Sequence, residues 1–594
     1  MNESPLVAAD PRELVREERA GGRLHVDRGL PFLCLFRDDG SPRARATAEI
    51  ASAMPAYAVL ADADQERQLE RHVHAACDKL GGFFLVELLE GDAPGELGVW
   101  LGDLRPGTAL VERLVEELAT LAALDPAPAV VLRDAAPPGL RPVPGLVQIG
   151  LELPPAYVHP ESQAPYLLLL QTLRKELSAA LRTLLARFLE LRLERPWPGG
   201  ALPGRRHVLA TEWAVDRELT EISRSYDFLL SVTPINGEPA WEAFRAAGFE
   251  RAPTLRYRPL TLDPDLMRRR LFEVPLEHVE EPVLAALFRA ERDSIDQRLR
   301  MLAQRDTPAF FHDSLQLYGT VEKHLERLAR AVISSVAPPA DEAAPQVDAE
   351  ALRQAAEREL DHYRQQLPEL DAEVLLRDDI ASVMVVKGNL LIPRTNRVPA
   401  ARVHALLQHE IGTHIVTYVN GGRQPLQLLA AGLSGYDELQ EGLAVLSEYL
   451  VGGLSPGRLR LLAGRVLAIH FLIDGASFVE VFRRLVQEFG FAKKTAFFVT
   501  LRVFRSGGLT KDAVYLRGIL HLLQALSRGA RFETLLLGKL GFDHVGMVDD
   551  LSGRGILRPP VLRPRYLSLP DAQRRLERVR RGVSVLELFQ SDAS

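Results

Sequence analysis

Two proline-rich breaks limit which parts of this chain can fold together. The segments RPWPGGALPG, at residues 195–204, and SVAPPADEAAPQVD, at residues 335–348, have no hydrophobic period and are typical of loops or linkers. With 594 residues, the chain also exceeds the roughly 100 to 200 residues of an ordinary domain. We therefore predict a first domain over residues 1–200, a helical subdomain over 205–336 and a third domain over 348–580.

The first 200 residues alternate short apolar runs with helical or proline-rich stretches. The runs LPFLCLF (30–36), GFFLVELLE (82–90) and AVVLRD (129–134) have the composition of β-strands. Between residues 165 and 194, leucines recur at helical spacing among arginines and glutamates, which predicts a long amphipathic helix. The pattern indicates an N-terminal α/β domain. No motif in it points to a chemistry, so its role stays open.

The remainder of the chain is predicted to be mostly helical, with one small sheet. Helical periods are clearest over residues 286–305 and 349–367. The segment SVMVVKGNLLIP (382–393) has two apolar runs on either side of Lys387 and Gly388, which predicts a β-hairpin. The predicted fold class is an α+β multidomain protein in which the α/β domain precedes a mostly α-helical part.

Composition and charge exclude several classes of protein. A net charge of −7 gives no basic surface for nucleic acid. The longest apolar runs, such as residues 166–170, are far shorter than the ~20 residues of a membrane span, and the N-terminus has no signal-peptide pattern. The two cysteines, Cys34 and Cys77, indicate a reducing compartment. We expect a cytoplasmic protein, and the scarcity of lysine beside arginine indicates a GC-rich, bacterial genome. No feature indicates an oligomeric state.

The most informative motif is HEIGTH, residues 409–414, in which two histidines flank a glutamate. In the common zinc peptidase helix the two histidines are four positions apart, but here they are five apart. On a regular α-helix, positions five apart lie roughly 140° from each other, too far round for one metal ion. A π-type bulge would remove most of this offset, and Gly412 and Thr413 lie where the bulge would form. Without a bulge, the histidines would be unrelated.

A catalytic zinc ion bound by two histidines needs a third protein ligand and leaves its fourth position to water. The segment YDELQEGLAVLSEYL (436–450) forms the next predicted helix. Glu441 and Glu448 share one face of it, and the small residues Gly442 and Ala444 allow a neighbouring helix to approach closely. A histidine pair on one helix and a glutamate on the next is typical of gluzincin peptidases. We predict Glu441 as the third ligand, while Glu448 either orients a histidine or is simply exposed.

Several motifs together resemble one known family. HEIGTH, VNGGRQP (419–425) and QEGLA (440–444) are similar to the bacterial family named for its QEGLA motif, which is described as modulating flavohaemoglobin expression. The eukaryotic relatives of that family are the microtubule-associated tyrosine carboxypeptidases. The resemblance continues through residues 255–282, 314–319 and 509–518, and it covers roughly residues 205–575.

This resemblance implies a zinc-dependent carboxypeptidase that hydrolyses a C-terminal bond of a peptide or protein substrate. His409, His414 and Glu441 would bind Zn²⁺, and Glu410 would be the general base that activates a zinc-bound water. The fold expected for residues 348–580 is a gluzincin-like, mostly α-helical metallopeptidase domain with a small β-sheet. Tyrosine specificity belongs to the eukaryotic relatives and is not carried over.

A carboxypeptidase must neutralise the free carboxylate of its substrate, a task that suits arginine and lysine. Arg423 follows the metal helix in a glycine-rich loop, and the other candidates are Lys387, Arg394 and Lys511. Each of them has the alternative of being a solvated surface charge. Tyr515 is a candidate donor to the tetrahedral oxyanion, although a tyrosine on an apolar helix more often packs in a core. The predicted hairpin either aligns an extended peptide along its edge or belongs to the core.

Two other classes of function are compatible with the sequence. One is a regulatory or scaffolding zinc-binding protein that modulates gene expression without peptidase activity. The presence of Glu410 argues against it, because a structural zinc site has no need of a base. The other is a binding module whose N-terminal domain sets the function.

Overall fold

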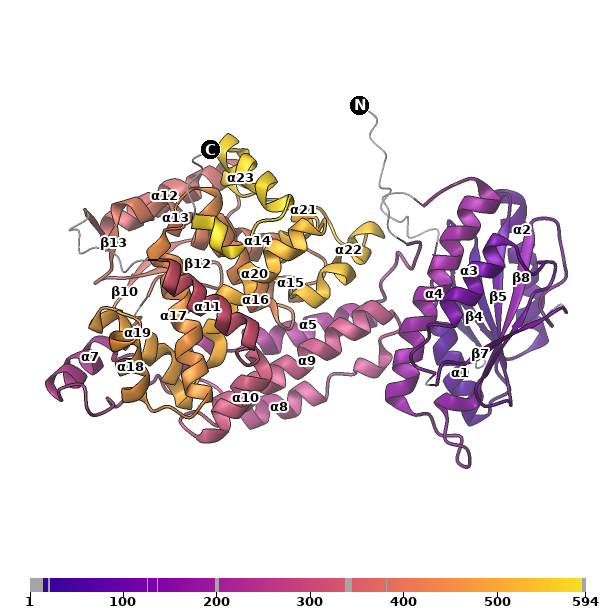
Figure 1. Ribbon diagram of the computed structural model, residues 1–594. Helices are drawn as coiled ribbons and strands as arrows, with labels where there is room; N and C mark the ends of the chain where they lie inside the picture. Colours follow the sequence, from indigo (N-terminus) through magenta and orange to yellow (C-terminus); the bar gives the residue numbers. More distant parts are fainter. Residues whose placement is uncertain are drawn as a thin grey trace. The chain divides into compact units, whose positions relative to one another are not determined.

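The computed structural model describes residues 14–19, 22–124, 126–135, 137–197, 202–336, 345–380 and 382–589. Parts of the two proline-rich breaks, residues 198–201 and 337–344, lie outside the described residues. The chain forms two compact units (Figure 1). The first unit comprises Met1–Ala214, Pro275–Ala286 and Gly546–Leu557, and the second comprises Val215–Val274, Leu287–Val545 and Arg558–Ser594. The domain limits expected from the sequence stay a prediction.

The first unit contains one eight-stranded sheet. Its strands are β1 (Leu14–Arg19), β2 (Gly22–Asp27), β3 (Phe32–Arg37), β4 (Tyr57–Leu60), β5 (Phe83–Glu90), β6 (Glu96–Trp100), β7 (Ala129–Arg133) and β8 (Leu146–Leu153). Their order in the sheet is β1-β2-β4-β3-β5-β8-β6-β7. The central strands β4, β3, β5 and β8 are parallel, whereas β2 and β6 pair antiparallel with β4 and β8. β3 is a nearly continuous buried run, as expected of a parallel strand covered on both faces.

Four long helices accompany this sheet: α1 (Pro42–Ser52), α2 (Ala63–Leu80), α3 (Ala109–Leu118) and α4 (Leu167–Leu193). The connections β3-α1-β4 and β4-α2-β5 cross the sheet in opposite directions, so right-handed crossovers place α1 and α2 on opposite faces. In α4, the ring of Phe188 stacks on Phe84 of β5, with 5.4 Å between the ring centroids. The predicted N-terminal α/β architecture is confirmed, including β3, β5, β7 and the long helix.

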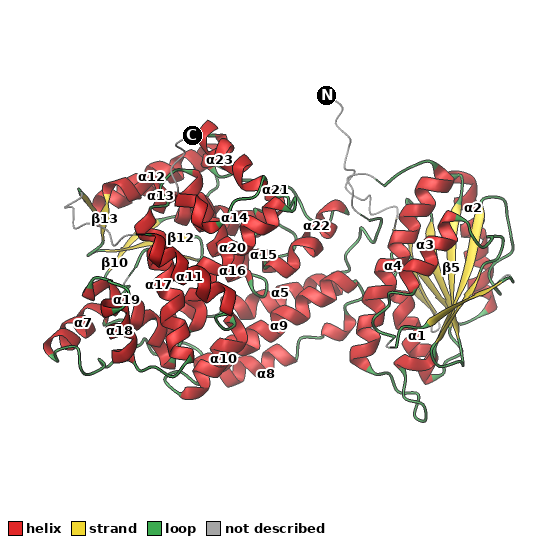
Figure 2. Cartoon of the chain, in the orientation of Figure 1, coloured by secondary structure: helices red, strands yellow, loops and turns green. Residues whose placement is uncertain are grey.

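The remainder of the chain is mostly helical (Figure 2). Its helices up to the metal motif are α5 (Ala210–Arg224), α6 (Phe228–Val232), α7 (Gly237–Ala246), α8 (Pro264–Phe272), α9 (Pro282–Ala303), α10 (Pro308–Tyr318), α11 (Lys323–Ser335) and α12 (Ala349–Gln366). α13 (Val403–His409), η6 (Glu410–Ile415), α14 (Val416–Gly422), α15 (Leu428–Ala431), α16 (Tyr436–Leu450) and α17 (Pro456–Ile473) follow. The last are α18 (Phe478–Gln487), α19 (Lys493–Phe504), α20 (Val514–Ser527), α21 (Phe532–Leu535), α22 (Val545–Gly553) and α23 (Pro570–Arg580). Among the described residues, no helix has the combined length and hydrophobicity that crossing a membrane requires.

Two small sheets lie in the second unit. β10 (Val374–Arg377), β12 (Asn389–Pro393) and β11 (Met384–Val386) form one in that order, and β9 (Gln346–Asp348) pairs with β13 (Arg397–Pro399) in the other. β11 and β12 are the predicted hairpin, closed by the pair Val386–Asn389. Lys387 and Gly388 in its turn both have a positive φ, 48° and 85°, as a two-residue type I′ turn requires.

Helix α16 lies in the core of the second unit and is buried without interruption from Leu439 to Leu450. α20 packs against α16 where each of the two helices has a glycine. A Cβ atom added to Gly442 would lie 2.6 Å from the carbonyl carbon of Gly518, closer than real Cβ contacts allow. The close helix approach expected at Gly442 is therefore confirmed, and it holds the face of α16 that carries Glu441 in a fixed position.

Candidate metal centre

The HEIGTH segment forms a π-helical turn between two α-helices. In η6 (Glu410–Ile415) the hydrogen-bond spacing widens, and the N–H of Val416 donates to the carbonyl of Ile411, five residues earlier. The extra residue in this turn brings the rings of His409 and His414 together, with 5.1 Å between their centroids. The bulge predicted from the five-residue spacing is confirmed.

Glu441 completes a cluster with the two histidines. Its Oε2 atom lies 3.7 Å from Nε2 of His409 and 3.7 Å from Nε2 of His414. The three candidate ligand atoms lie within 4.8 Å of one another. This Oε2 atom is buried, and it has no hydrogen-bond partner in the described part of the chain. The structure thus brings together the three residues that the sequence singled out as ligands.

The residues of this cluster fit a zinc ion. Zinc bonds of about 2 Å place tetrahedral ligand atoms about 3 to 4 Å apart, and two imidazole nitrogens with one carboxylate oxygen are a known catalytic donor set. A buried carboxylate oxygen is unfavourable unless a hydrogen bond, an opposite charge or a metal ion compensates it. The two 3.7 Å distances from Oε2 of Glu441 to the histidine nitrogens fall in this range, and this buried oxygen has no hydrogen-bond partner among the described residues.

Glu448 holds the other side of the His409 ring. Its Oε1 lies 2.9 Å from Nδ1 of His409, and Arg402 and Arg458 each approach the same carboxylate at 3.1 Å. Burial raises the pKa of Glu448, but the charge of Arg458 and the hydrogen bond with His409 outweigh it and hold the pKa well below its usual range. Glu448 is 1% exposed, so the alternative of a surface glutamate is wrong, and the carboxylate orients a histidine.

Lys511 and Tyr515 lie beside Glu441. The buried Nζ of Lys511 is 3.4 Å from Oε1 of Glu441 and 3.0 Å from Oδ1 of Asp437. Burial opposes the charge of Lys511, but these two carboxylates outweigh it and raise its pKa well above the ordinary value. Burial and, next, the charge of Glu441 raise the pKa of the Tyr515 phenol, which therefore keeps its proton at neutral pH.

Glu410 is buried next to the cluster and is 7% exposed. Burial raises its pKa above the ordinary value, although the neighbouring His409 and His414 oppose the shift. Within the described residues, no group donates a hydrogen bond to its carboxylate. Its lone pairs are therefore available to a proton from outside the protein.

The other three candidate cations lie in different surroundings. Arg423 follows α14 and pairs with Glu369 at 3.2 Å, and its side chain is 44% exposed. Arg394 pairs with Asp378 at 3.2 Å, also near the surface. Lys387, in the hairpin turn, lines a pocket beside the cluster. Of these three, Lys387 is the one that lines this pocket.

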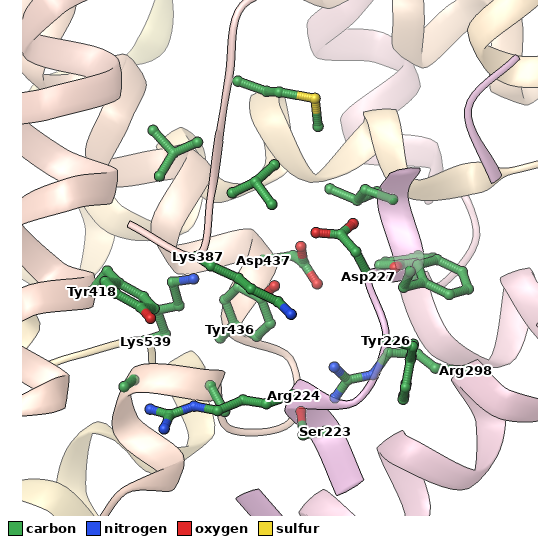
Figure 3. Close-up of a pocket in the computed structure, with 18 residues that line it drawn as sticks. Ser223, Arg224, Tyr226, Asp227, Arg298, Lys387, Tyr418, Tyr436, Asp437 and Lys539 are labelled. Atoms are coloured by element: carbon green, nitrogen blue, oxygen red, sulfur yellow. The ribbon is translucent and has the colours of Figure 1, made fainter. Parts of the chain in front are cut away.

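This pocket is shown in Figure 3. It is lined by tyrosines and aliphatic residues of β11, together with several charged groups. The charged and aromatic residues include Arg224, Tyr226, Asp227, Arg298, Tyr318, Lys387, Tyr418, Tyr436, Asp437 and Lys539. Asp437 connects the pocket to the cluster, because Lys511 bridges it to Glu441.

Three residues of the pocket, Lys539, Tyr418 and Tyr436, were not among the predicted site residues. Tyr418 follows His414 by four residues, about one turn, so helical spacing from that ligand would have found it. Tyr436 precedes Glu441 by five residues, a spacing that gives no such signal on a regular helix. Lys539 lies about a hundred residues beyond Glu441, and no motif around it connects it to the metal helix.

In this centre, a histidine pair and a carboxylate face one another, and a second, free carboxylate and an open pocket lie beside them. This arrangement is typical of a hydrolase centre rather than of a closed structural metal site. Comparison with known families agrees with this class. Residues 242–583 match the family model of the microtubule-associated tyrosine carboxypeptidases, and the chain belongs to this family. Searches of curated proteins and of solved structures found no match.

Family membership confirms the relation inferred from the HEIGTH and QEGLA segments. It implies a carboxypeptidase-type activity and a peptide or protein as substrate, and it does not favour a regulatory protein without activity. Most of the sheet-containing first unit lies outside the matched residues.

Proposed function

We propose that the chain is a zinc-dependent metallocarboxypeptidase of the HExxxH type, with a gluzincin-like ligand arrangement, that removes the C-terminal residue of a peptide or protein. The observation that carries this proposal is the buried, unpartnered Oε2 of Glu441, which lies at the same distance from Nε2 of His409 and of His414. Family membership supports the carboxypeptidase activity.

His409, His414 and Glu441 are the residues that would hold the ion, and Glu448 orients the ring of His409 through its Nδ1 atom. When bound there, zinc lowers the pKa of a water molecule and polarises the carbonyl of the scissile bond. Glu410, directly after His409, accepts the proton of the attacking water and passes it to the leaving amine. Its free lone pairs suit both transfers.

Tyr515 is the candidate donor to the oxyanion that forms when water adds to the carbonyl. It lies beside Glu441 and Lys511 at the start of α20. Because its phenol keeps its proton, the O–H group can donate a hydrogen bond to a negatively charged oxygen.

The edge strand β11 is the candidate guide for the substrate backbone. In a two-residue hairpin the pair next to the turn is hydrogen-bonded, so the following pair, Val385–Leu390, is not. The N–H and C=O of Val385 therefore point away from β12, towards the edge on which no strand of the described chain pairs. Met384, Val385 and Val386 line the pocket, so a peptide paired with β11 would run along it.

Metal content is the first test of the proposed function. Elemental analysis of protein purified without added zinc is expected to give about one zinc per chain, and His409→Ala is expected to lose it. A folded wild-type protein that binds no zinc even when the ion is supplied would overturn the proposal.

Glu410→Gln tests the role of the base. We expect this variant to retain its zinc and to lose hydrolysis of a peptide ending in tyrosine by at least ~100-fold, the contribution of general base catalysis. The peptide is chosen from the name of the family. Glu488→Gln, which changes an exposed glutamate of the same unit, is the matched control and should keep full activity. An active Glu410→Gln enzyme with normal zinc content would exclude Glu410 as the base.

A further inference from the structure

Lys539 has an unusual position in the pocket of Figure 3. Its ammonium group lies between two aromatic rings, 5.2 Å from the centroid of Tyr418 and 5.6 Å from that of Tyr436. In the described part of the chain, no carboxylate lies within ion-pair distance of it. Two cation–π contacts hold the group in place but do not neutralise its charge.

The backbone of Lys539 is fixed on both sides. Its N–H donates to the carbonyl of Leu429 at 2.7 Å, and its carbonyl accepts from the N–H of Leu433 at 2.9 Å. The preceding Gly538 packs so tightly that a Cβ atom there would lie 2.6 Å from the carbonyl oxygen of Leu429. The loop thus presents the ammonium group from a rigid support, which favours binding because little further ordering is needed.

The other charges of the pocket leave this cation unmatched. Asp437 forms an ion pair with Lys511 at 3.0 Å, and Arg298 forms one with Glu291 at 2.8 Å. Burial lowers the pKa of Lys539 to about 8, Asp437 and Asp227 offset this only partly, and Arg224 adds repulsion. The group still carries its charge at neutral pH, with less hydration and less countercharge than an exposed lysine has. An anion that enters the pocket would supply the missing partner.

The pocket and the metal cluster share two helices. Tyr418 of α14 follows His414 of η6 by one turn of the continuous helix, and Asp437 precedes Glu441 by one turn on α16. Lys511 bridges Asp437 of the pocket to Glu441 of the cluster, at 3.0 Å and 3.4 Å. Lys539, which lies over Tyr418, therefore belongs to a pocket that adjoins the candidate metal centre.

We propose that Lys539 binds the free C-terminal carboxylate of the substrate, with the terminal side chain lying against Tyr418 and Tyr436. This inference rests on the proposed function and names the group that would make the enzyme an exopeptidase. Lys387 and Arg224, the other cations of the pocket without an ion pair among the described residues, are exposed and less firmly held. Lys511 is already neutralised by Asp437 and Glu441.

The experiment compares one peptide ending in tyrosine with the same peptide as its C-terminal amide. We expect the wild-type enzyme to prefer the free acid in kcat/KM, and Lys539→Met to reduce this preference about 10- to 100-fold, the range for a lost hydrogen bond to a charged group. In this variant, kcat/KM for the amide should fall far less than kcat/KM for the acid. Lys494→Met, at an exposed lysine paired with Glu238, is the control and should keep the preference. Circular dichroism melts verify that each variant is folded.

A second measurement separates this inference from the proposed function. Calorimetric titration of the two peptides into Glu410→Gln protein, with and without Lys539→Met, reports binding without turnover. Stronger binding of the acid that disappears with Lys539→Met supports the site even if no peptide is cleaved. Two results would overturn the assignment of Lys539 without affecting the proposed peptidase activity. One is a preference for the acid that persists in Lys539→Met. The other is a preference that is lost in Lys387→Met or Arg224→Met instead. Equal binding of acid and amide by Glu410→Gln protein that retains Lys539 also overturns it.

Discussion

Two glutamates of one helix, Glu441 and Glu448, contact the same histidine from different sides. They are seven residues apart, which is about two turns, so both point from the same face of α16. Glu441 faces Nε2 of His409, and Glu448 takes its Nδ1. The imidazole is fixed at one nitrogen so that the other is directed into the cluster.

The two glutamates should therefore differ in their effect on metal affinity. Glu448→Gln is expected to weaken zinc binding by about 10- to 100-fold, the usual effect of losing a partner of a ligand, and Glu441→Gln by more. Competition with a chromophoric chelator measures both affinities. If the two variants bound zinc as tightly as Glu488→Gln, Glu441 would not be a ligand.

Among the structural elements, the crossing of α16 and α20 most directly controls the position of the candidate ligands. The helices meet at Gly442 and Gly518 with their backbones in contact, and Glu441 is the neighbour of one of these glycines. A methyl group at this crossing would force the helices apart, and the displacement would reach the cluster.

Gly442→Ala is expected to lower the free energy of unfolding by about 1 to 3 kcal/mol, as overpacking does in a close-packed core, and to weaken zinc binding as well. Urea denaturation measures the first effect and chelator competition the second. The control is Gly457→Ala in α17, where an added Cβ atom meets nothing within 4 Å. A Gly442→Ala protein as stable as the Gly457→Ala protein would show that the helices can separate without strain.

The edge strand β11 allows a prediction about the substrate backbone. Val385→Pro removes an N–H group that points to the open edge, so the fold should tolerate it. We expect kcat/KM for the tyrosine peptide to fall about 10-fold and the melting temperature to change little. A 10-fold loss corresponds to one hydrogen bond whose net free energy is near the upper end of the usual range. Unchanged kinetics would place the substrate backbone elsewhere in the pocket.

At the scale of the whole molecule, the first unit is assembled from three separate segments of the chain. Arg182 of α4 illustrates how they are joined: it donates to the carbonyl of Pro203 at 2.8 Å and binds Asp550, which lies more than 350 residues further along. Arg554 and Glu281, from the other two segments, form a buried pair at 3.1 Å. The sheet-containing unit is thus not simply the first part of the sequence.

Arg182→Met is expected to destabilise the protein by about 1 to 3 kcal/mol, because buried acceptors lose their donor. Arg187→Met is the matched control, since Arg187 lies on the same helix and pairs with Glu190 at the surface, where such pairs contribute little. Urea denaturation compares the two variants. Equal stabilities would mean that the segment containing Asp550 does not stabilise the first unit.

Local patterns accounted for much of this structure. The turn at Lys387 and Gly388, the π turn at Gly412 and the paired glutamates of α16 each depend on residues a few positions apart, and the sequence displays those spacings directly. Long-range features had no such signal. Lys539 reaches its place through backbone bonds to Leu429 and Leu433, and nothing in the order of residues marks that pairing.

The π turn also bears on how such proteins can be recognised. A π turn accommodates one additional residue while the helix before and after it keeps its direction and its faces. Deleting Gly412 would give HEITH, whose histidines share a face on an ordinary α-helix. We therefore expect that one residue gained or lost at this turn changes the spacing of the histidines in the sequence, while the ligands keep their relative positions in space. Homologues of this chain are therefore better identified by the spatial arrangement of their candidate metal ligands than by the number of residues between the two histidines.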